Sequence, residues 1–416
     1  MMRKLSNWAD SLTYGARQVH EPHTLDELRS LVAATDRIRP LGSGHSFSGV
    51  ADTTGDLVRL DRLPQSVVMD TQNRTVTVAA SMRYAELAQH LHGAGHALGN
   101  MASLPHTSVA GSVATGTHGS GDTQRCLAAA VRGLELVGPE GDLIELRRDT
   151  HGDEFAGAVV ALGALGVVTR LTLDIEPAYE VAQWVRLDVP LDEVAENVDA
   201  VFSAAYSVSL FTDWRSGQGA VWLKHRTDRP GSGWTGGRPA TRSVHPVPGV
   251  DPESSTEQLG VPGPWYQRLP HFRPELIPGA GAELQSEYFL PRERAATAFA
   301  AIRSVANQVA PMLHIAEVRT VRGDDLWLSS AYGRDTVTFH FTWHKDLPAV
   351  RPVIAAVEEL LMPLGARPHW AKLTETPAVR IIAGYPRATD FARLAVKHDP
   401  DAKFRSAFID QLFVNS

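Results

Sequence analysis

Positions 41–48 read Leu41-Gly42-Ser43-Gly44-His45-Ser46-Phe47-Ser48, and this stretch decides which fold the chain can adopt. Its glycines allow backbone amides to come close to a diphosphate, because no Cβ stands in the way. The dinucleotide fingerprint G-x-G-x-x-G is nevertheless absent, since Phe47 occupies the third glycine position. A Rossmann fold is therefore not supported.

Two further segments rich in small residues follow. They read Ser103-Leu104-Pro105-His106-Thr107-Ser108-Val109-Ala110-Gly111-Ser112-Val113-Ala114-Thr115-Gly116-Thr117-His118-Gly119-Ser120-Gly121 and Ala161-Leu162-Gly163-Ala164-Leu165-Gly166-Val167-Val168-Thr169. Small side chains let a large rigid ligand lie against the backbone, while hydroxyl groups donate to its oxygens. A single stretch of this kind is more often a tight turn, but three in one part of the chain favour a ligand-binding surface.

Length and composition limit the class of protein. The 416 residues predict two or three domains, and 43% hydrophobic with 21% charged residues is typical of a globular chain. The net charge of −7 without a basic block argues against nucleic acid as a partner. Cys126 is the only cysteine, which excludes an internal disulfide and a cysteine-rich zinc site, and we expect it to be a small buried or semi-exposed residue and not a nucleophile. No apolar run reaches about 18 residues, so we expect a cytoplasmic protein without a membrane span.

Periodicity predicts interspersed helices and strands. A capping box of Thr24 and Glu27 predicts a helix start, and a second helix is expected at 84–94. Strands are expected at 57–60, 75–79, 313–321 and 336–343, a hairpin at 134–146, and later helices at 292–309 and 349–364. The Pro- and Gly-rich stretch 226–273 keeps several aromatic residues, which indicates an ordered loop. The pattern is that of an α+β protein with a boundary near Pro177.

Six segments together resemble the vanillyl-alcohol-oxidase-like flavoproteins and, within that family, the alditol oxidases. They are 42–47, 100–106, 108–121, 162–169, 205–214 and 367–372, which span nearly the whole length. The resemblance implies an α+β, two-domain fold. Its parts are an FAD-binding domain of the PCMH type at 1–177, a substrate (cap) domain with an antiparallel sheet at 178–365, and a C-terminal segment, 366–416, that returns to the FAD domain.

The resemblance also implies FAD attached covalently through His45, whose neutral imidazole is a competent nucleophile. The residues expected to bind FAD are Leu41, Gly42, Ser43, Gly44, His45, Ser46, Phe47, Ser103, Ser108, Gly111, Thr115, Gly116, Thr117, His118, Val168 and His369.

Two strand candidates carry polar pairs. Glu317 and Arg319 share one face by period-two alternation, and so do His340 and Thr342. In isolation each pair is more often a solvated strand face, but four such groups suit a ligand rich in hydroxyls. The resemblance places these residues in the substrate pocket together with Ser103 and Lys372. It leaves His340 or Lys372 as the catalytic base, with an electrostatic role favoured for Lys372.

The activity that the resemblance implies is oxidation of the terminal primary hydroxyl of alditols such as xylitol and sorbitol to the aldose, with O2 reduced to H2O2, by a monomer. A sugar-lactone oxidase or a dehydrogenase of the same family is the alternative. A non-enzymatic sugar-binding module would not need three flavin-type segments. A serine hydrolase is weakly supported, since Ser48 replaces the last glycine of G-x-S-x-G. No metal site is predicted, because His20-Glu21-Pro22-His23 has the wrong spacing.

Overall fold

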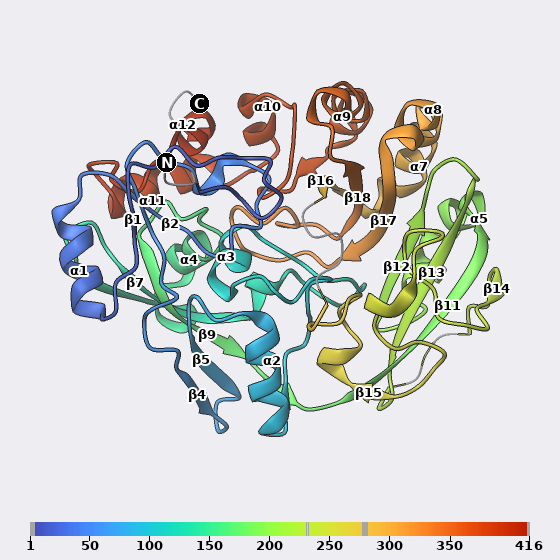
Figure 1. Ribbon diagram of the computed structural model, residues 1–416, viewed down its shortest axis with the longest axis horizontal. Helices are drawn as coiled ribbons and strands as arrows, with labels where there is room; N and C mark the ends of the chain where they lie inside the picture. Colours follow the sequence, from blue (N-terminus) through green and yellow to red (C-terminus); the bar gives the residue numbers. More distant parts are fainter. Residues whose placement is uncertain (1–4, 230, 232, 277–281, 414–416) are drawn as a thin grey trace.

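The computed structural model describes residues 5–229, 231, 233–276 and 282–413, and it contains two main antiparallel sheets (Figure 1). The first has five strands in the order β4 (Val67–Asp70), β5 (Thr75–Ala79), β9 (Val167–Asp174), β7 (Val131–Val137) and β8 (Leu143–Arg147). Beside it lie a parallel sheet of β1 (Val19–His20), β3 (Asp56–Val58) and β2 (Ile38–Pro40), and the pair β10 (Glu176–Pro177) and β6 (His96–Ala97).

The second sheet has nine strands. Their order is β14 (Arg238–Pro239), β11 (Glu180–Pro190), β13 (Gln218–Arg226), β12 (Ser207–Thr212), β17 (Leu313–Val321), β18 (Thr336–His344), β16 (Glu283–Pro291) and β19 (Arg367–Pro368), with β15 (Gly263–Pro264) paired to β11. The sequence-predicted domain boundary near residue 177 falls between β9 and β11, and the domain limits themselves stay a prediction.

Twelve α-helices connect these strands in the part of the chain that the structure describes. They are α1 (Leu25–Ala34), α2 (Tyr84–Gly93), α3 (Val109–Ala114), α4 (Arg148–Val159), α5 (Leu191–Glu196), α6 (Val198–Phe202), α7 (Ala295–Ser304), α8 (Ala306–Val309), α9 (Leu347–Leu361), α10 (Ala378–Ala383), α11 (Ala388–His398) and α12 (Ala407–Phe413). In Figure 1, α7 and α9 lie along the same side of β16, β17 and β18. None of the described helices is long and apolar enough to span a membrane.

One face of the nine-stranded sheet is apolar and is covered by helices. Phe299 of α7 and Ile354 of α9 pack in one buried cluster with Val318 and Phe339 of the sheet. The opposite face carries the alternate side chains and turns towards the glycine-rich segments, as the cavity described below shows. The period-two alternation of the strands thus separates a core face from a polar face.

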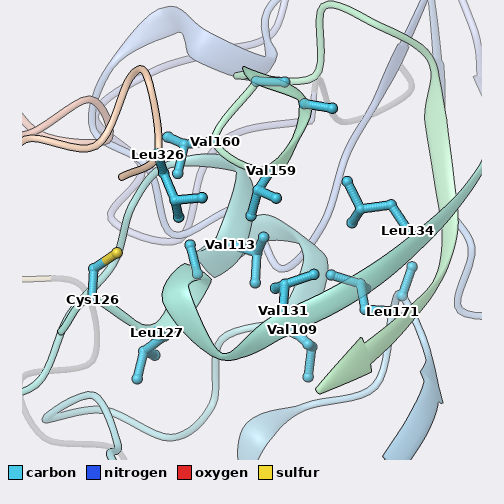
Figure 2. Close-up of a cluster of buried hydrophobic side chains, with 14 of the residues drawn as sticks. Val109, Val113, Cys126, Leu127, Val131, Leu134, Val159, Val160, Leu171 and Leu326 are labelled. Atoms are coloured by element: carbon cyan, nitrogen blue, oxygen red, sulfur yellow. The ribbon is translucent and has the colours of Figure 1, made fainter. Parts of the chain in front are cut away.

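Helix α3 fixes the second glycine-rich segment to the five-stranded sheet. Figure 2 shows Val109 and Val113 of α3 in an apolar cluster with Val131 of β7 and Leu171 of β9. The small residues of this run offer little apolar surface of their own, but its valines recur at helical spacing and are fully or almost fully buried.

The buried guanidinium of Arg39 links distant parts of the chain. It donates hydrogen bonds to the carbonyls of Val50, Leu162, Gly163 and Phe404. The chain just after the first glycine-rich segment, the third segment and the C-terminal region therefore share one buried donor.

Most predicted elements are confirmed, with local differences. Thr24 caps α1 by accepting from the amide of Glu27 at 3.1 Å, but the carboxylate of Glu27 accepts from His23 and not from Thr24. The hairpin is present as β7 and β8, and the helix expected at 292–309 is divided into α7 and α8. The described part of the loop 226–273 is ordered, with helical turns at Pro252–Ser254 and Trp265–Gln267, while residues 230 and 232 of that predicted loop lie outside the described residues.

Candidate active site

A single cavity of about 570 Å³ joins the glycine-rich segments to the polar face of the nine-stranded sheet. Of the sequence-predicted cofactor, substrate and catalytic residues, all except Gly116 line it. Gly116 has a φ of +67°, and the cavity is lined by its neighbours Thr115 and Thr117. The structure thus brings two groups of residues that were predicted separately into one site.

The first two glycine-rich segments pack tightly at one end of this cavity. The amide of Ser108 donates to Oγ of Ser43 at 3.2 Å. A Cβ at Gly42 would lie 2.5 Å from Oγ of Ser108, and one at Gly111 would lie 2.8 Å from the same atom. Glycine at both positions therefore leaves room for the hydroxyl of Ser108 in its present orientation. Oγ of Ser108 is buried and has no hydrogen-bond partner among the described residues, so it is available to a ligand.

His45 lines the cavity beside Trp8. The two rings are stacked, with centroids 5.5 Å apart and an interplanar angle of 21°. Nδ1 of His45 is buried and has no partner among the residues that the structure describes. Burial, with smaller contributions from the nearby Arg83 and His106, lowers the pKa of His45 to about 4. The imidazole is therefore neutral near pH 7, with a nitrogen that protein atoms leave free.

The C-terminal region reaches the first glycine-rich segment through backbone contacts. The amide of Phe47 donates to the carbonyl of Ala371 at 2.7 Å, and Oγ of Ser48 donates to the carbonyl of Trp370 at 2.6 Å. These bonds place Lys372 at the cavity, between the glycine-rich end and the sheet.

The register of three strands sets the polar end of the cavity. His340 of β18 lies directly opposite Glu317 of β17 on one side and Glu287 of β16 on the other. Because side chains alternate, the next pair along the same face of β16 and β18 is Gln285 and Thr342. The polar pairs predicted on two separate strands therefore belong to one continuous face.

Glu287 is the centre of a buried cluster of cations. Its Oε1 accepts from Arg319 at 2.7 Å and lies 3.0 Å from Nε2 of His118, while its Oε2 accepts from Lys372 at 2.6 Å. Burial alone raises the pKa of Glu287, but Lys372, Arg319 and His118 outweigh it and hold the pKa well below its ordinary value. Glu287 is therefore an anion that orients both Arg319 and Lys372.

Glu317 is the second buried carboxylate of the site. Its Oε1 lies 2.8 Å from Nε2 of His271, and its Oε2 lies 3.5 Å from Nε of Arg319 and 3.8 Å from Nδ1 of His340. Burial opposes ionisation, yet Arg319 and His271 lower the pKa of Glu317 far below its ordinary value. Arg319 thus bridges two carboxylates and also donates to Oγ of Ser103 at 3.2 Å.

His340 offers an unpaired nitrogen to the cavity. Its Nε2 is buried and has no partner among the described residues. Burial lowers the pKa of His340 to about 3, and Lys372 contributes to the decrease. The nearby carboxylate of Glu317 favours the tautomer with the proton on Nδ1, which leaves a lone pair on Nε2.

His118, Glu287 and His369 place ligand atoms within 4.8 Å of one another, which is close enough for a metal ion. Both oxygens of Glu287 are already engaged by Arg319 and Lys372. A divalent cation would add charge beside two existing cations, so electrostatics disfavours a metal at this cluster.

The cavity residues missed by the sequence reasoning include Glu287, Gln285 and His271, which lie beside the predicted polar groups. A signal for the first two was present, because Glu283, Gln285 and Glu287 alternate with Leu284, Ser286 and Tyr288. No local signal identifies His271, which lies in the irregular loop before β16 and is brought to the site by tertiary contacts alone.

Cys126 is buried, as predicted, and lies in the apolar cluster of Figure 2. Its Sγ lies 3.2 Å from Oδ2 of Asp324. Burial raises the pKa of Cys126 well above its ordinary value, and Asp324 adds to the increase. The thiol is therefore unsuited to act as a nucleophile.

Comparison with protein families gives two matches. Residues 16–147 match a family described as an FAD binding domain, and residues 282–412 match one described as D-arabinono-1,4-lactone oxidase. Among curated proteins, the chain is 51% identical to an alditol oxidase of Streptomyces sp. (strain IKD472 / FERM P-14339), over 99% of both chains. It is 26% identical to an L-gulonolactone oxidase of Bos taurus, over 99% of this chain and 98% of that one.

Comparison with solved structures agrees on the fold. The crystal structure of cholesterol oxidase from B. sterolicum superposes with a TM-score of 0.78 at 13% identity, over 99% of this chain and 96% of that one. At this identity the likeness concerns the architecture alone. It confirms the predicted α+β architecture with an antiparallel sheet, and the family match at residues 16–147 confirms the FAD-binding domain.

Proposed function

The chain belongs to the alditol oxidase family of FAD-dependent oxidoreductases, and from this membership we propose that it oxidises the terminal primary hydroxyl of an alditol. The alcohol loses two electrons and two protons to become the aldose, and O2 gains them to become H2O2. Xylitol and sorbitol are the substrates that we expect.

The observation that supports this proposal most strongly is the bridge of Arg319 between Glu287 and Glu317 at the polar end of the cavity. The anions accept hydrogen bonds from hydroxyl groups, while Arg319 and Ser103 donate to hydroxyl oxygens. Thr342 and Gln285 extend the same face away from this centre. A row of alternating donors and acceptors fits a chain of hydroxyl-bearing carbons and disfavours a simple monoalcohol.

The remaining features of the cavity fit FAD. The glycines at positions 42 and 111 permit close approach, and Ser108 Oγ and His45 Nδ1 are buried without protein partners among the described residues. When bound, FAD accepts the two electrons of the alcohol and passes them on to O2. The predicted residues of the three glycine-rich segments and His369 would hold it, with Val168 near the adenine. His45 is the residue that we propose to carry the covalent bond.

We propose that Nε2 of His340 accepts the proton of the reacting hydroxyl. This nitrogen has a free lone pair, and a neutral form near pH 7 follows from its low pKa. Such an imidazole is a weak base, but the hydroxyl becomes strongly acidic as its carbon loses electrons. Lys372 is less suited to accept a proton, because it already donates to Glu287. We propose that its charge stabilises negative charge that develops in the site.

The test is H2O2 release by the purified yellow protein with xylitol, sorbitol, 1-butanol and L-gulono-1,4-lactone. The proposal expects high catalytic efficiency with the two alditols and at least about a hundredfold lower efficiency with butanol. Equal efficiency with xylitol and butanol would contradict it.

A sugar-lactone oxidase is the second candidate, because residues 282–412 match the lactone-oxidase family. Preference for the lactone over both alditols would favour this activity. Substrate oxidation that needs an artificial electron acceptor and releases no H2O2 would identify a dehydrogenase. Three further predictions remain proposals: the domain limits, the monomeric state and the cytoplasmic location. Size-exclusion chromatography tests the monomeric state.

A further inference from the structure

Lys224 is a buried cation that the proposed reaction does not use. It lies on β13, with 1% of its surface exposed, on the strand face whose neighbours across the sheet are Gln183 of β11 and Ser207 of β12. Its Nζ donates to the carbonyls of Leu269 and Pro270, the latter at 3.0 Å. Burial of a charged lysine is costly, and hydrogen bonds such as these must offset its desolvation.

The third partner of Lys224 is the side chain of His271, whose Nδ1 lies 3.1 Å from Nζ. An ammonium group has three donors and no acceptor, so Nδ1 must accept in this contact. The single proton of a neutral imidazole is then on Nε2. Burial lowers the pKa of His271 to about 4, and Lys224 contributes to the decrease, so the ring is neutral near pH 7.

Nε2 of His271 faces Oε1 of Glu317 at 2.8 Å. The aromatic rings of Phe211 and Trp222 pack edge-on against His271, with centroids 5.2 and 5.5 Å away, and keep water from the contact. Ser209 Oγ lies 3.3 Å from the same nitrogen. The amide of His271 also donates to the carbonyl of Ser103 at 3.2 Å. One loop residue therefore touches two of the groups assigned to the substrate.

We propose that Lys224 and His271 are positioning residues: Lys224 holds His271 in the tautomer that donates to Oε1 of Glu317, so that Oε2 stays turned to the substrate hydroxyls. This inference rests on the proposed function only for the identity of the substrate. The relay itself, from Lys224 through His271 to Glu317, is a property of the protein without its ligands.

The relay depends on the charge of Lys224. Burial lowers the pKa of Lys224 to about 7, Glu317 opposes the decrease, and Arg319 adds to it. Above this pH the amine gains a lone pair and can accept from Nδ1–H, which would turn an unprotonated Nε2 towards the carboxylate. The charged or titratable groups that face this chain of contacts are Glu317, Arg319 and His340 of the sheet.

The first test reads the tautomer directly and needs no substrate. Imidazole ¹⁵N shifts are measured by NMR on histidine-labelled holoenzyme at pH 6, with the His271 signal identified by its loss in His271→Gln. We expect the Nε2–H form in the wild type and the Nδ1–H form or a mixture in Lys224→Met. An Nδ1–H form in the wild type overturns the proposal whatever the substrate is.

The second test separates positioning from stabilisation by kinetics. His271→Gln keeps an N–H donor near the position of Nε2, whereas His271→Leu removes it. We expect His271→Leu and Lys224→Met to raise KM for xylitol about tenfold, as expected for loss of a hydrogen bond to a charged group. His271→Gln should remain within about threefold of the wild type. If Lys224→Met does not fold, the comparison of His271→Gln with His271→Leu still shows whether the N–H donor of His271 affects KM.

Gln183→Leu is the matched control. Gln183 is also fully buried, and its amide donates to the carbonyls of Thr256 and Glu257 in the same loop. This variant loosens the loop but leaves the relay intact, so KM should not change. If Gln183→Leu, His271→Leu and Lys224→Met all reduce the melting temperature alike and leave KM unchanged, the relay is a structural support only and the proposal fails. A wild type that shows the Nε2–H tautomer but does not oxidise xylitol refutes the proposed function and keeps the relay.

Discussion

Lys372 and Glu287 form a buried ion pair of 2.6 Å although they are 85 positions apart in the sequence. Glu287 also accepts from Arg319, so one carboxylate balances two cations of the site. Loss of this charge would leave Lys372 without its carboxylate partner and Arg319 with Glu317 as its one remaining counter-ion among the described residues.

We therefore expect Glu287→Gln to reduce kcat about a hundredfold and the free energy of unfolding by about 3 kcal/mol. The substitution conserves size, so the effect comes from charge. Steady-state assays and urea denaturation measure the two quantities. Glu293→Gln, at an exposed position just after β16, is the control and should alter neither. Normal kcat in Glu287→Gln would show that Arg319 and Lys372 do not depend on this anion.

Acid precipitation tests the covalent link at His45. We expect yellow colour to remain with the wild-type pellet and to be released into the supernatant from His45→Ala. Because the pKa of His45 is about 4, its imidazole is neutral down to roughly that pH. Covalent incorporation of FAD added to the apoprotein should therefore proceed at pH 5.5 as well as at pH 7.5. His106→Ala is the control, and its pellet should stay yellow. Release of the yellow colour from both the wild type and His45→Ala would exclude the covalent link.

Exchange of His340 for asparagine separates the two candidate bases. The amide of asparagine lies near the position of Nδ1 and can still donate to Glu317, whereas nothing replaces Nε2. We expect kcat to fall at least about a hundredfold with unchanged flavin absorbance, since a general base contributes on the order of 10² or more. A variant that retains more than a tenth of kcat would make Lys372 the base.

Buried histidines make stability fall in acid. The pKa values of His271 and His340 are lowered by burial to about 4 and about 3, below the ordinary value of 6.5. Their contribution is fully present above pH 6.5 and is lost as the pH falls towards these values, because the unfolded chain binds protons first. At pH 5 we expect a loss of about 2 kcal/mol for each histidine, since one pKa unit corresponds to about 1.4 kcal/mol.

Urea denaturation at pH 7.5 and pH 5.0 measures this loss. His271→Gln should show a smaller difference between the two pH values than the wild type. The same urea midpoint at both pH values in the wild type would mean that these imidazoles are hydrated in the folded protein.

The parts of the site that could be predicted are those with a local pattern. Period-two alternation placed Glu317 with Arg319, and His340 with Thr342, each on one strand face. It could not tell that the two strands are neighbours, because pairing depends on contacts between distant segments. Glu287 was missed for the same reason, since its significance arises only when β16 pairs with β18.

Loops and termini were harder to predict than strands. The glycine-rich segments were recognised by composition, but composition did not reveal that Val109 and Val113 would form part of a short helix. His271 has no periodic context at all, and only the folded loop brings it to Glu317. Prediction from sequence thus ended where function depends on residues brought together by tertiary structure.

The buried hydrogen bonds of Arg39 also have a consequence in time. A ribosome makes Arg39 early, but one carbonyl that it needs belongs to Phe404, 365 positions later. Until that residue has been synthesised, the guanidinium lacks one of its four carbonyl partners, and burying it is less favourable. The cavity wall beside the first and third glycine-rich segments therefore gains its full set of hydrogen bonds only after the C-terminal region has been made.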